Sequence, residues 1–449
     1  MRASISEFFE DLRSSKLLKS GVIVFFFVFA GRGIQFLKEL FVAKEIGAST
    51  DLDAFIIALL VNNIFLNFLF ASLGYALIPI FIRIKNYSLQ KANLFFNKIV
   101  LFSLFLGGLG YLLIALFSQL YIPYVAGGFS EETKALSEGM IYLLAPFYFF
   151  TILNGLFGAY LNAFNKNLLY SIYPAFPAFF TVLLFLLVPH DQPIWLQVYG
   201  FNIGSLIAFV ALWISCRQSG YEWSITFNLD KSFRICLNQW IPLIFSALIL
   251  SISPMVDTKM ASDLGASSVS HLEYGSKLFS IFTSLAITVF TILLYPYFSE
   301  KIAEKDFSGI LSFLKKSTAL LLVPLIVGTA GVIYFSSELI QLLFERGEFE
   351  AHDTAIVSEV MDYYMVGFPI LALGMIGVRL LNALQFNKLI MYYSIVNVVL
   401  NIVLNIWFID LFGLKGVALS TSFVYFVNAL LVWSSVAWFF RNKMKKGLI

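Results

Sequence analysis

The sequence predicts an all-α polytopic membrane protein with about twelve transmembrane helices. Of the 449 residues, 59% are hydrophobic and only 13% are charged, which is about half the charged share of a soluble domain. Mean hydropathy is +0.85. The apolar residues form runs of about 20 or more, the length that crosses a hydrocarbon core about 30 Å thick. The small net charge of +3 gives no indication of nucleic-acid binding.

Hydropathy places each helix along the chain. The polar N-terminal stretch MRASISEFFEDLRSSKLLKS is too long for the charged region of a signal peptide, and no cleavage site follows the first apolar run. We therefore expect that run to remain as a helix. Several runs are long enough to indicate tilt or interfacial ends. The predicted spans are 18–45, 52–83, 93–121, 137–164, 167–188, 194–216, 234–263, 270–299, 311–335, 356–384, 387–410 and 416–440.

The basic residues support an even number of spans. With a cytoplasmic N-terminus, 21 of the 30 Lys and Arg residues fall on the cytoplasmic side and 5 fall outside. This asymmetry is the one that orients membrane proteins, and it predicts that both termini are cytoplasmic. The four remaining basic residues lie within predicted spans: Arg32, Lys38, Lys277 and Arg379.

Internal similarity predicts two halves. IGASTDLDAFIIALL (46–60) resembles LGASSVSHLEYGSKL (264–278), and YLNAFNKNLLYSIY (160–173) resembles LLNALQFNKLIMYY (380–393), at nearly the same offset. The repeat indicates six-helix lobes at 1–220 and 234–449, joined by a cytoplasmic linker at 221–233. Because six is even, the lobes run in the same direction and are related by a pseudo-two-fold axis along the membrane normal, with a site expected between them.

The first predicted span carries charged residues, and the free-energy cost of placing them in the membrane must be compensated. A charge at the centre of the bilayer costs at least about 2.5–3.5 kcal/mol. Arg32, Gln35 and Glu39 share one helix face at i, i+3 and i+7, whereas Lys38 lies about 100° away. A structural alternative is that Arg32 pairs with Glu39 while Lys38 extends to the interface, which would only hold the bundle together.

Further polar residues occur in the second span and in its repeat. Asp53 and Asn63 lie in span 2, and Lys277 lies in the equivalent span of the second half. If the halves face each other, Arg32, Lys38 and Lys277 converge on one hydrated cavity. Arginine binds phosphate oxygens in a fork and lysine acts as a point charge, so this cavity suits a phosphate-bearing substrate.

A stripe of amides lies in the eleventh span. Asn397 and Asn401 are four residues apart, and Asn405 continues nearly the same face. Such stripes usually join helices by hydrogen bonds. Alternatively, Asn397 and Asn401 coordinate a sodium ion together with Asp257 of span 7 and Thr421 of span 12, because oxygen ligands suit a hard cation.

The sequence carries no feature of a known enzyme class. It lacks a Ser/His/Asp set, a Walker loop, a nucleotide-binding fingerprint and paired catalytic carboxylates. Cys216 and Cys236 have no CxxC or His companion, so we interpret them as free thiols. We therefore predict neither an enzyme nor a resident cofactor, apart from a coupling ion such as Na⁺ or H⁺.

Three stretches carry a resemblance to a known family: LLFERGEFEAHDT (342–354), GRGIQFLKELFVAKEIGASTDLDAFIIALLVNN (31–63) and GASSVSHLEYGSKL (265–278). They resemble the MviN/MurJ family of lipid II flippases, within the MOP superfamily that includes polysaccharide flippases and MATE drug exporters. The resemblance extends from about residue 17 to about residue 440.

The resemblance implies a function and a site. In that family a cationic cavity binds the diphosphate of an undecaprenyl-linked saccharide, and alternating access is driven by the membrane potential or an ion gradient. It implies a monomer in the bacterial inner membrane. By position, the substrate-binding residues would be Arg32, Lys38, Asp53, Asn63 and Lys277, and a sodium site known in some members would fall near Asp257, Asn397, Asn401 and Thr421.

The chain also departs from the family pattern. Leu66 and Asn67 stand where the family usually carries two arginines, and the chain ends at RNKMKKGLI without the family's last two helices. These departures leave the substrate open between lipid II and an O-antigen- or capsule-type oligosaccharide. Two other classes are a MATE-like cation-coupled exporter, which needs an acidic cavity, and a membrane scaffold for envelope assembly.

Overall fold

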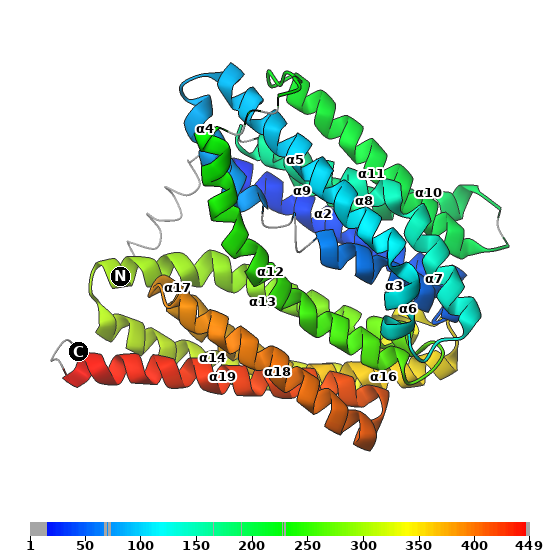
Figure 1. The fold of residues 1–449 in the computed structure, drawn as a ribbon. Coiled ribbons are helices and arrows are strands. Elements are labelled where there is room, and N and C mark those ends of the chain that lie inside the picture. The colour runs from blue at the N-terminus through cyan, green and yellow to red at the C-terminus, as the bar shows by residue number, and fades with distance from the viewer. Residues whose placement is uncertain are drawn as a thin grey trace. The chain divides into compact units, whose positions relative to one another are not determined.

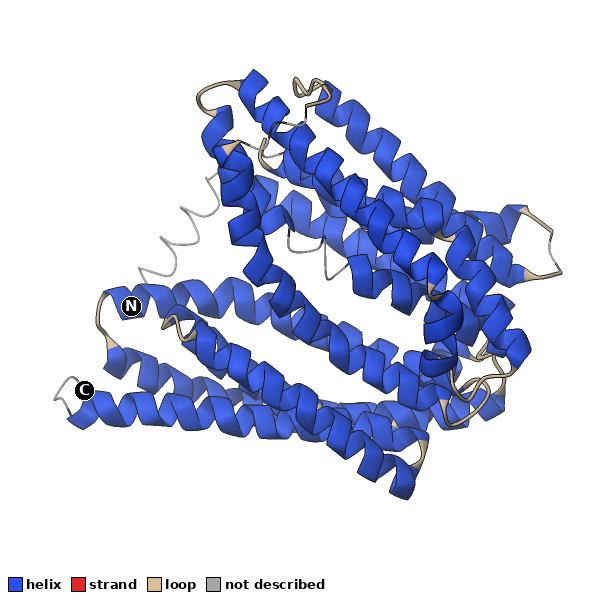
Figure 2. Ribbon diagram, viewed as in Figure 1, coloured by secondary structure: helices blue, strands red, loops and turns tan. Residues whose placement is uncertain are grey.

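The computed structural model describes residues 16–66, 70, 73–164, 166–189, 191–226, 228 and 230–445. Within these ranges the regular structure is helical (Figures 1 and 2), which confirms the predicted all-α class. Asn67 and His190 lie outside the described residues. The elements are α2 (Lys16–Glu45), α3 (Thr50–Leu66), α4 (Leu73–Lys85), α5 (Leu89–Leu116), α6 (Ser118–Val125), α7 (Glu131–Leu143), α8 (Ala145–Asn162), α9 (Asn167–Ile172), η2 (Tyr173–Ala175), α10 (Phe176–Leu187), α11 (Pro193–Arg217), α12 (Lys231–Ser262), α13 (Ser268–Ala303), α14 (Phe307–Tyr334), α15 (Ser336–Phe344), α16 (Ala351–Val366), α17 (Phe368–Ala383), α18 (Asn387–Phe412) and α19 (Leu414–Lys445).

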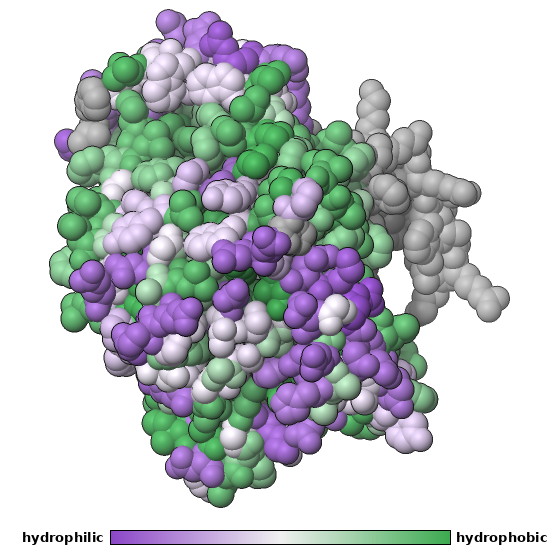
Figure 3. All heavy atoms as spheres, turned by 90° about the vertical axis from the view of Figure 1, so that its right-hand side faces the viewer, coloured by the Kyte–Doolittle hydropathy of each residue, from purple (hydrophilic) through white to green (hydrophobic). Residues whose placement is uncertain are grey.

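Several of these helices can cross a membrane. Among the described residues, seven are long and apolar enough, or eight if α7 and α8 count as one span bent by 46°. The face drawn in Figure 3 carries both hydrophobic and hydrophilic side chains. On α14, the exposed residues include Leu320, Val323 and Val327. Exposed aliphatic side chains along a helix are expected where the solvent is lipid.

The chain forms two compact units, which differ from the contiguous halves expected from the repeat. Unit 1 comprises Met1–Glu45, Ala58–Tyr121 and Ala135–Leu248, and unit 2 comprises Ile46–Ile57, Ile122–Lys134 and Ile249–Ile449. Two short segments from the N-terminal half therefore belong to unit 2. The long helix α12 is shared, because its first part belongs to unit 1 and its second part to unit 2.

An aromatic cluster forms the centre of unit 1, where α5, α8 and α11 meet. The ring of Phe96 lies 5.4 Å from that of Phe157 and 5.0 Å from that of Tyr160. Tyr221, which follows α11, completes the cluster at 5.6 Å from Phe96. The edge-to-face geometry of these rings is the favourable arrangement of aromatic quadrupoles.

The expected linker packs onto unit 1. Asn97 of α5 donates to the carbonyl of Glu222 at 2.9 Å and accepts from the hydroxyl of Tyr221 at 2.6 Å. Asp230 then begins α12, because its carboxylate accepts from the backbone N–H of Phe233 at 2.9 Å, as an N-cap residue does. Lys98, which is buried, donates to the same carboxylate at 2.7 Å. These bonds hold the segment before α12 in one place.

We expect Asp230→Asn to lower thermal stability by about 1–2 kcal/mol at neutral pH, because it leaves Lys98 without its anion. Burial alone would raise the pKa of Asp230, but the hydrogen bonds from Lys98 and from the backbone of Phe233 outweigh it and hold the pKa below its ordinary value. A lowered pKa in the folded state gives stability that is present above the unfolded pKa and lost as pH falls through the folded pKa.

The measurement is the melting temperature in detergent from pH 7 down to pH 3. The difference between the parent and Asp230→Asn should shrink steadily as the pH falls below 4. Asp191→Asn removes an exposed carboxylate that has no ion pair in the described structure, and it should melt like the parent throughout. A difference that stays constant over the whole pH range would contradict the assignment.

Unit 2 is built around α13, α16, α17 and α19, which pack against one another. Among the described residues, one cluster of buried side chains joins α14, α17 and α19 through Leu314, Ile376, Leu380, Val436 and Phe440. A second, smaller cluster joins α18 to α19. These clusters fix the helices that carry the polar residues described next.

Candidate functional site

Arg32 is exposed on α2 in unit 1. Its guanidinium donates to Gln35 Oε1 at 3.2 Å, and Gln35 in turn donates to the carbonyl of Pro174 at 3.1 Å. The predicted shared face of Arg32 and Gln35 is therefore confirmed. Within the part of the chain that the structure describes, Arg32 has no carboxylate partner, so its charge is available to an anionic ligand.

Lys38 is the buried cation of the same helix. Its Nζ forms an ion pair with the neighbouring Glu39 at 2.7 Å and lies 5.6 Å from the centre of the Phe201 ring of α11. The structural alternative, in which Arg32 pairs with Glu39, is thus not the observed arrangement. Glu39 neutralises the charge of Lys38 and is not a partner of Arg32.

Lys277 belongs to unit 2 and lies on α13. Its Nζ pairs with Glu273 at 2.7 Å, one helical turn earlier. This i, i+4 pair is partly exposed, and such pairs contribute only a few tenths of a kcal/mol. Since Arg32 and Lys38 belong to unit 1, the convergence of the three cations on one cavity stays a prediction.

Asp53 is fully buried at the start of α3. Its Oδ1 accepts from the backbone N–H of Ser270 at 2.7 Å and from the Ser270 hydroxyl. Ser270 lies in the first turn of α13, where backbone N–H groups have no partner within the helix. In this structure Asp53 therefore binds a helix N-terminus across 217 residues of sequence.

The contact between Asp53 and Ser270 predicts that substitution of Asp53 lowers stability but leaves substrate transport nearly unchanged. Asp53→Ala should lower stability by about 2–3 kcal/mol, because it leaves the Ser270 N–H unpaired. Transport per folded molecule should stay within about twofold of the parent. Thermal melting and a transport assay normalised to folded protein measure the two effects. The exposed Asp51→Ala is the matched control. Normal stability with lost transport would instead place Asp53 in the substrate site.

The asparagine pair of α3 gives an unexpected result. Asn63 is exposed, whereas Asn62 is buried and neither its amide oxygen nor its nitrogen has a hydrogen-bond partner in the described structure. Asn62 was not predicted, because the polar residues of α3 show no helical periodicity that separates a protein-facing side from a lipid-facing side. Leu66, one turn later, is also buried.

A polar cavity of about 310 Å³ lies within unit 2, between α12, α18 and α19. All four residues predicted as a sodium site line it: Asp257, Asn397, Asn401 and Thr421. Asp257 accepts from Asn401 Nδ2 at 3.1 Å, whereas the hydroxyl of Thr421 donates to the carbonyl of Val417 at 3.3 Å. A residue 144 positions away in the sequence thus meets this carboxylate.

Two further residues complete this cluster. Asn405 makes the shorter bond to Asp257, at 2.6 Å, and its own oxygen accepts from Ser420. Asn397 donates to Asn428 at 2.9 Å. The i+4 spacing of the amide stripe could have identified Asn405, whereas nothing in the local sequence distinguishes Asn428.

The cavity contains oxygens that fit a cation. The side-chain oxygens of Asn397 and Asn401 are buried without a hydrogen-bond partner among the described residues. Unpaired buried acceptors are costly, and they call for a bound ion, a water or another donor. Together with the carboxylate of Asp257, they provide the all-oxygen donors that a hard cation prefers.

The segment LLFERGEFEAHDT (342–354) packs against the first turns of α13 and against the loop before α3, all within unit 2. His271 Nε2 and Asp353 Oδ1 are 2.8 Å apart, and the Tyr274 ring lies 5.1 Å from that of Phe349. Gly47, at a φ of +68°, approaches the backbone of Glu348 so closely that a Cβ there would clash. A left-handed, crowded position of this kind requires glycine.

Comparisons with known proteins agree over nearly the whole chain. The family described as "Lipid II flippase MurJ" matches residues 42–444. A probable lipid II flippase MurJ of Borreliella burgdorferi is 23% identical over 425 residues, covering 93% of this chain and 83% of its own length. The corresponding protein of Vibrio cholerae is 26% identical over 447 residues, covering 95% and 84%.

Solved structures show the same fold. The structure titled "Lipid II flippase MurJ, inward closed conformation" aligns with a TM-score of 0.79 at 23% identity, covering 93% of this chain and 87% of that one. A multidrug resistance MATE family transporter of the MOP superfamily aligns with a TM-score of 0.69 at 14% identity, covering 90% and 93%. Because the family match extends from the last turn of α2 to residue 444 of α19, which is most of the chain, this chain belongs to the lipid II flippase MurJ family.

Proposed function

We propose that this protein moves a polyprenyl-diphosphate-linked saccharide, lipid II or a related envelope precursor, across the bacterial inner membrane by alternating access. The family and its curated relatives are named as flippases, which are transporters rather than enzymes. The observation that carries the proposal is the exposed guanidinium of Arg32, which lies on an apolar helix without a carboxylate partner in the described structure.

The chemistry of the substrate accounts for that arginine. A diphosphate presents oxygens that a guanidinium can bind with two parallel hydrogen bonds. Lys38 and Lys277 add positive charge, but each is already paired with a glutamate. We therefore assign Arg32 the main contact and the two lysines a supporting role. Asn63 is exposed on α3 and is a candidate for the saccharide or phosphate oxygens.

The proposal includes the finer architecture that the sequence predicts. It comprises twelve spans in two lobes, cytoplasmic termini and a monomer that alternately opens a cavity between its lobes. The excess of basic residues on one side of the predicted topology supports the orientation. A substrate cavity within one chain needs no second copy.

A coupling cation would be held by Asp257, Asn397, Asn401 and Thr421, joined by Asn405. The unpaired amide oxygens in the cavity support this assignment. A bound Na⁺ would supply positive charge that compensates the Asp257 carboxylate; a proton on that carboxylate is the alternative. Either would couple unit 2 to an ion gradient.

Two other functions remain as alternatives. An O-antigen- or capsule-type flippase would use the same diphosphate contact, and Leu66, at a position where the family usually carries arginine, favours testing it. A MATE-like exporter of organic cations would need an acidic cavity. The one carboxylate in the polar cavity of unit 2 is surrounded by amides that donate to it, which does not favour a cationic drug.

Rescue of growth tests the proposed function. A bacterium depleted of its own lipid II flippase would express this chain, and labelled lipid II reaching the outer leaflet would be followed. Growth that depends on Arg32 supports a peptidoglycan precursor as substrate. A well-inserted protein that does not rescue would rule out lipid II, and O-antigen and capsule intermediates would then be tested in the same way.

A further inference from the structure

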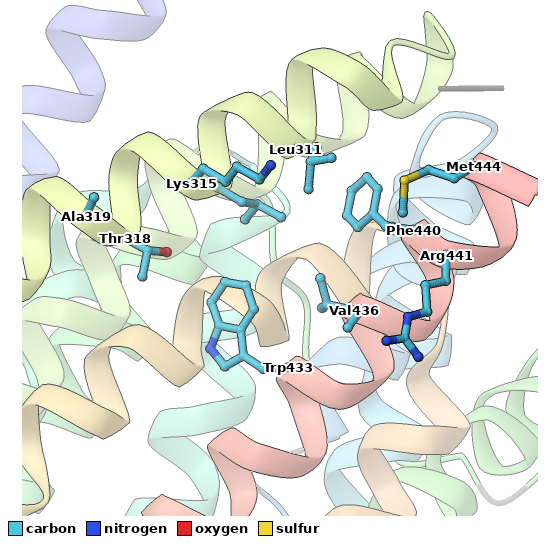
Figure 4. Close-up of a pocket in the computed structure, with 11 residues that line it drawn as sticks. Leu311, Lys315, Thr318, Ala319, Trp433, Val436, Phe440, Arg441 and Met444 are labelled. Carbon is cyan, nitrogen blue, oxygen red and sulfur yellow. The ribbon is translucent and has the colours of Figure 1, made fainter. Parts of the chain in front are cut away.

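A second cavity, of about 640 Å³, lies at one end of unit 2 between α14 and α19. Figure 4 shows its lining residues. Its volume is in the range of ligand-binding sites, roughly 300–1,000 Å³. The cavity is separate from the polar one, with which it shares no lining residue. Its walls come from residues 311–319 of α14 and residues 433–444 of α19.

The floor of this groove is apolar. Leu314, Val436 and Phe440 are each only 3% exposed, and they belong to the core cluster that α17 completes from behind. Trp433 and Leu311 form its sides (Figure 4). A surface of this shape and composition accommodates an aliphatic chain. Because lipid tails are as apolar as the groove, the chain gains only packing contacts there, and selectivity depends on the headgroup.

Two cations border the groove. Lys315 projects from α14 and Arg441 from α19 (Figure 4), and both are exposed. Neither side chain makes an ion pair or a hydrogen bond within the described structure, and no acidic residue lines the groove. Their charges are therefore not neutralised by any of the described residues.

The position of these cations along the helices is informative. Lys315 lies near the beginning of the apolar part of α14, and Arg441 lies just past the apolar part of α19, where Lys443 and Lys445 follow. Arg441 thus lies at the end of the groove near the membrane surface, Lys315 lies about one helical turn past Leu311 on the other wall, and the apolar floor continues toward Trp433. Basic pockets between transmembrane helices at this depth bind anionic lipid headgroups.

We propose that this groove is a binding site for an anionic phospholipid. An acyl chain lies on Leu314, Val436 and Phe440, and the phosphodiester is bound by Lys315 and Arg441. Arginine supplies a fork of donors for the phosphate oxygens, and lysine supplies a second charge from the opposite side. The site is independent of the proposed transport cavity, so a bound phospholipid would stabilise unit 2 whatever substrate is carried.

Native mass spectrometry of the purified full chain tests the site. The probes are phosphatidylglycerol and phosphatidylcholine with identical acyl chains, added at equal concentration. The parent should bind phosphatidylglycerol at least tenfold more tightly. Lys315→Ala/Arg441→Ala should weaken this binding roughly 25-fold, about fivefold for each cation removed, and should leave phosphatidylcholine binding unchanged.

Two variants sharpen the result. Lys316→Ala removes the same charge from the next residue, which is exposed but does not line the groove, and it should bind like the parent. Ala437→Phe fills the groove without changing charge and should weaken binding of both lipids. Thermal melting of each variant confirms that it is folded.

Several outcomes would overturn the site. These are equal binding of the two lipids by the parent, unchanged phosphatidylglycerol binding in the double variant, or equally effective competition by tailless glycerol phosphate. Formation of a dimer that excludes added lipid would show that a second copy covers the groove instead. Lys315→Arg should bind phosphatidylglycerol like the parent, and Lys315→Gln should bind it more weakly. This pair of results would support the role of charge at that position.

Discussion

Arg32→Ala is expected to lower the transport rate by about 10- to 150-fold while the protein folds and inserts normally. The expected loss corresponds to about 1.5–3 kcal/mol, the contribution of hydrogen bonds to a charged group. Among the described residues, the Arg32 side chain makes one hydrogen bond, an exposed one to Gln35, so stability should change by less than about 1 kcal/mol. Transport of a labelled lipid-linked precursor, normalised to inserted protein, measures the effect.

Matched variants distinguish the role of Arg32 from a general loss of charge. Arg83→Ala removes an exposed arginine at the end of α4 and should transport normally. Arg32→Lys should be intermediate, because lysine keeps the charge but not the fork of donors. Lys277→Ala should have a smaller effect than Arg32→Ala, since Glu273 already pairs with Lys277. Normal transport by the double variant Arg32→Ala/Lys277→Ala would contradict the diphosphate assignment.

Asp257→Asn is expected to abolish the response of the protein to the coupling cation. If Na⁺ binds the cavity, the parent should melt at a higher temperature in NaCl than in KCl at equal ionic strength. Saturation at about 100 times the dissociation constant adds about 2.7 kcal/mol. The variant has no carboxylate to compensate the ion and should show no difference between the two salts. Its transport should also become independent of the sodium gradient.

The control for this experiment is Asp410→Asn, which removes an exposed carboxylate from α18, the helix that carries the amide stripe. It should keep the full sodium response. A sodium response that persists in Asp257→Asn would exclude this cavity as the sodium site. The proton alternative predicts instead that the parent has no sodium response and that Asp257→Asn removes the pH dependence of transport.

The helical fold was predictable because hydrophobicity alone identifies long apolar helices. The breaks within these helices were harder to predict from the sequence. The span predicted at 137–164 is bent by 46° between Leu143 and Ala145. Hydropathy carries no signal for such a bend, but Pro146 at the start of α8 marks it, because proline has no backbone N–H to continue the preceding helix. The membership of 46–57 in unit 2 likewise depends on contacts with residues far along the chain.

The candidate sites show the same limit. The stripe of Asn397 and Asn401 indicated a polar helix face, and that face does line a cavity with Asp257. A charged residue in a span, however, does not reveal its partner from the sequence. Asp53 and Lys38 were predicted to contact the substrate; in the structure the Asp53 carboxylate binds Ser270 and Lys38 pairs with Glu39, and their role in substrate binding stays a prediction. In each case, the sequence does not show which partner lies within hydrogen-bonding distance of the charged side chain.

The most direct measurement of the central claim is lipid II movement by the purified protein in sealed vesicles. Lipid II with a fluorescent label on its peptide would be placed in one leaflet, and a membrane-impermeant quencher would report its appearance in the other. The account predicts movement at least tenfold faster than in protein-free vesicles and a return close to that background in Arg32→Ala vesicles. Movement at the protein-free rate, or equal movement by the parent and Arg32→Ala, would contradict it.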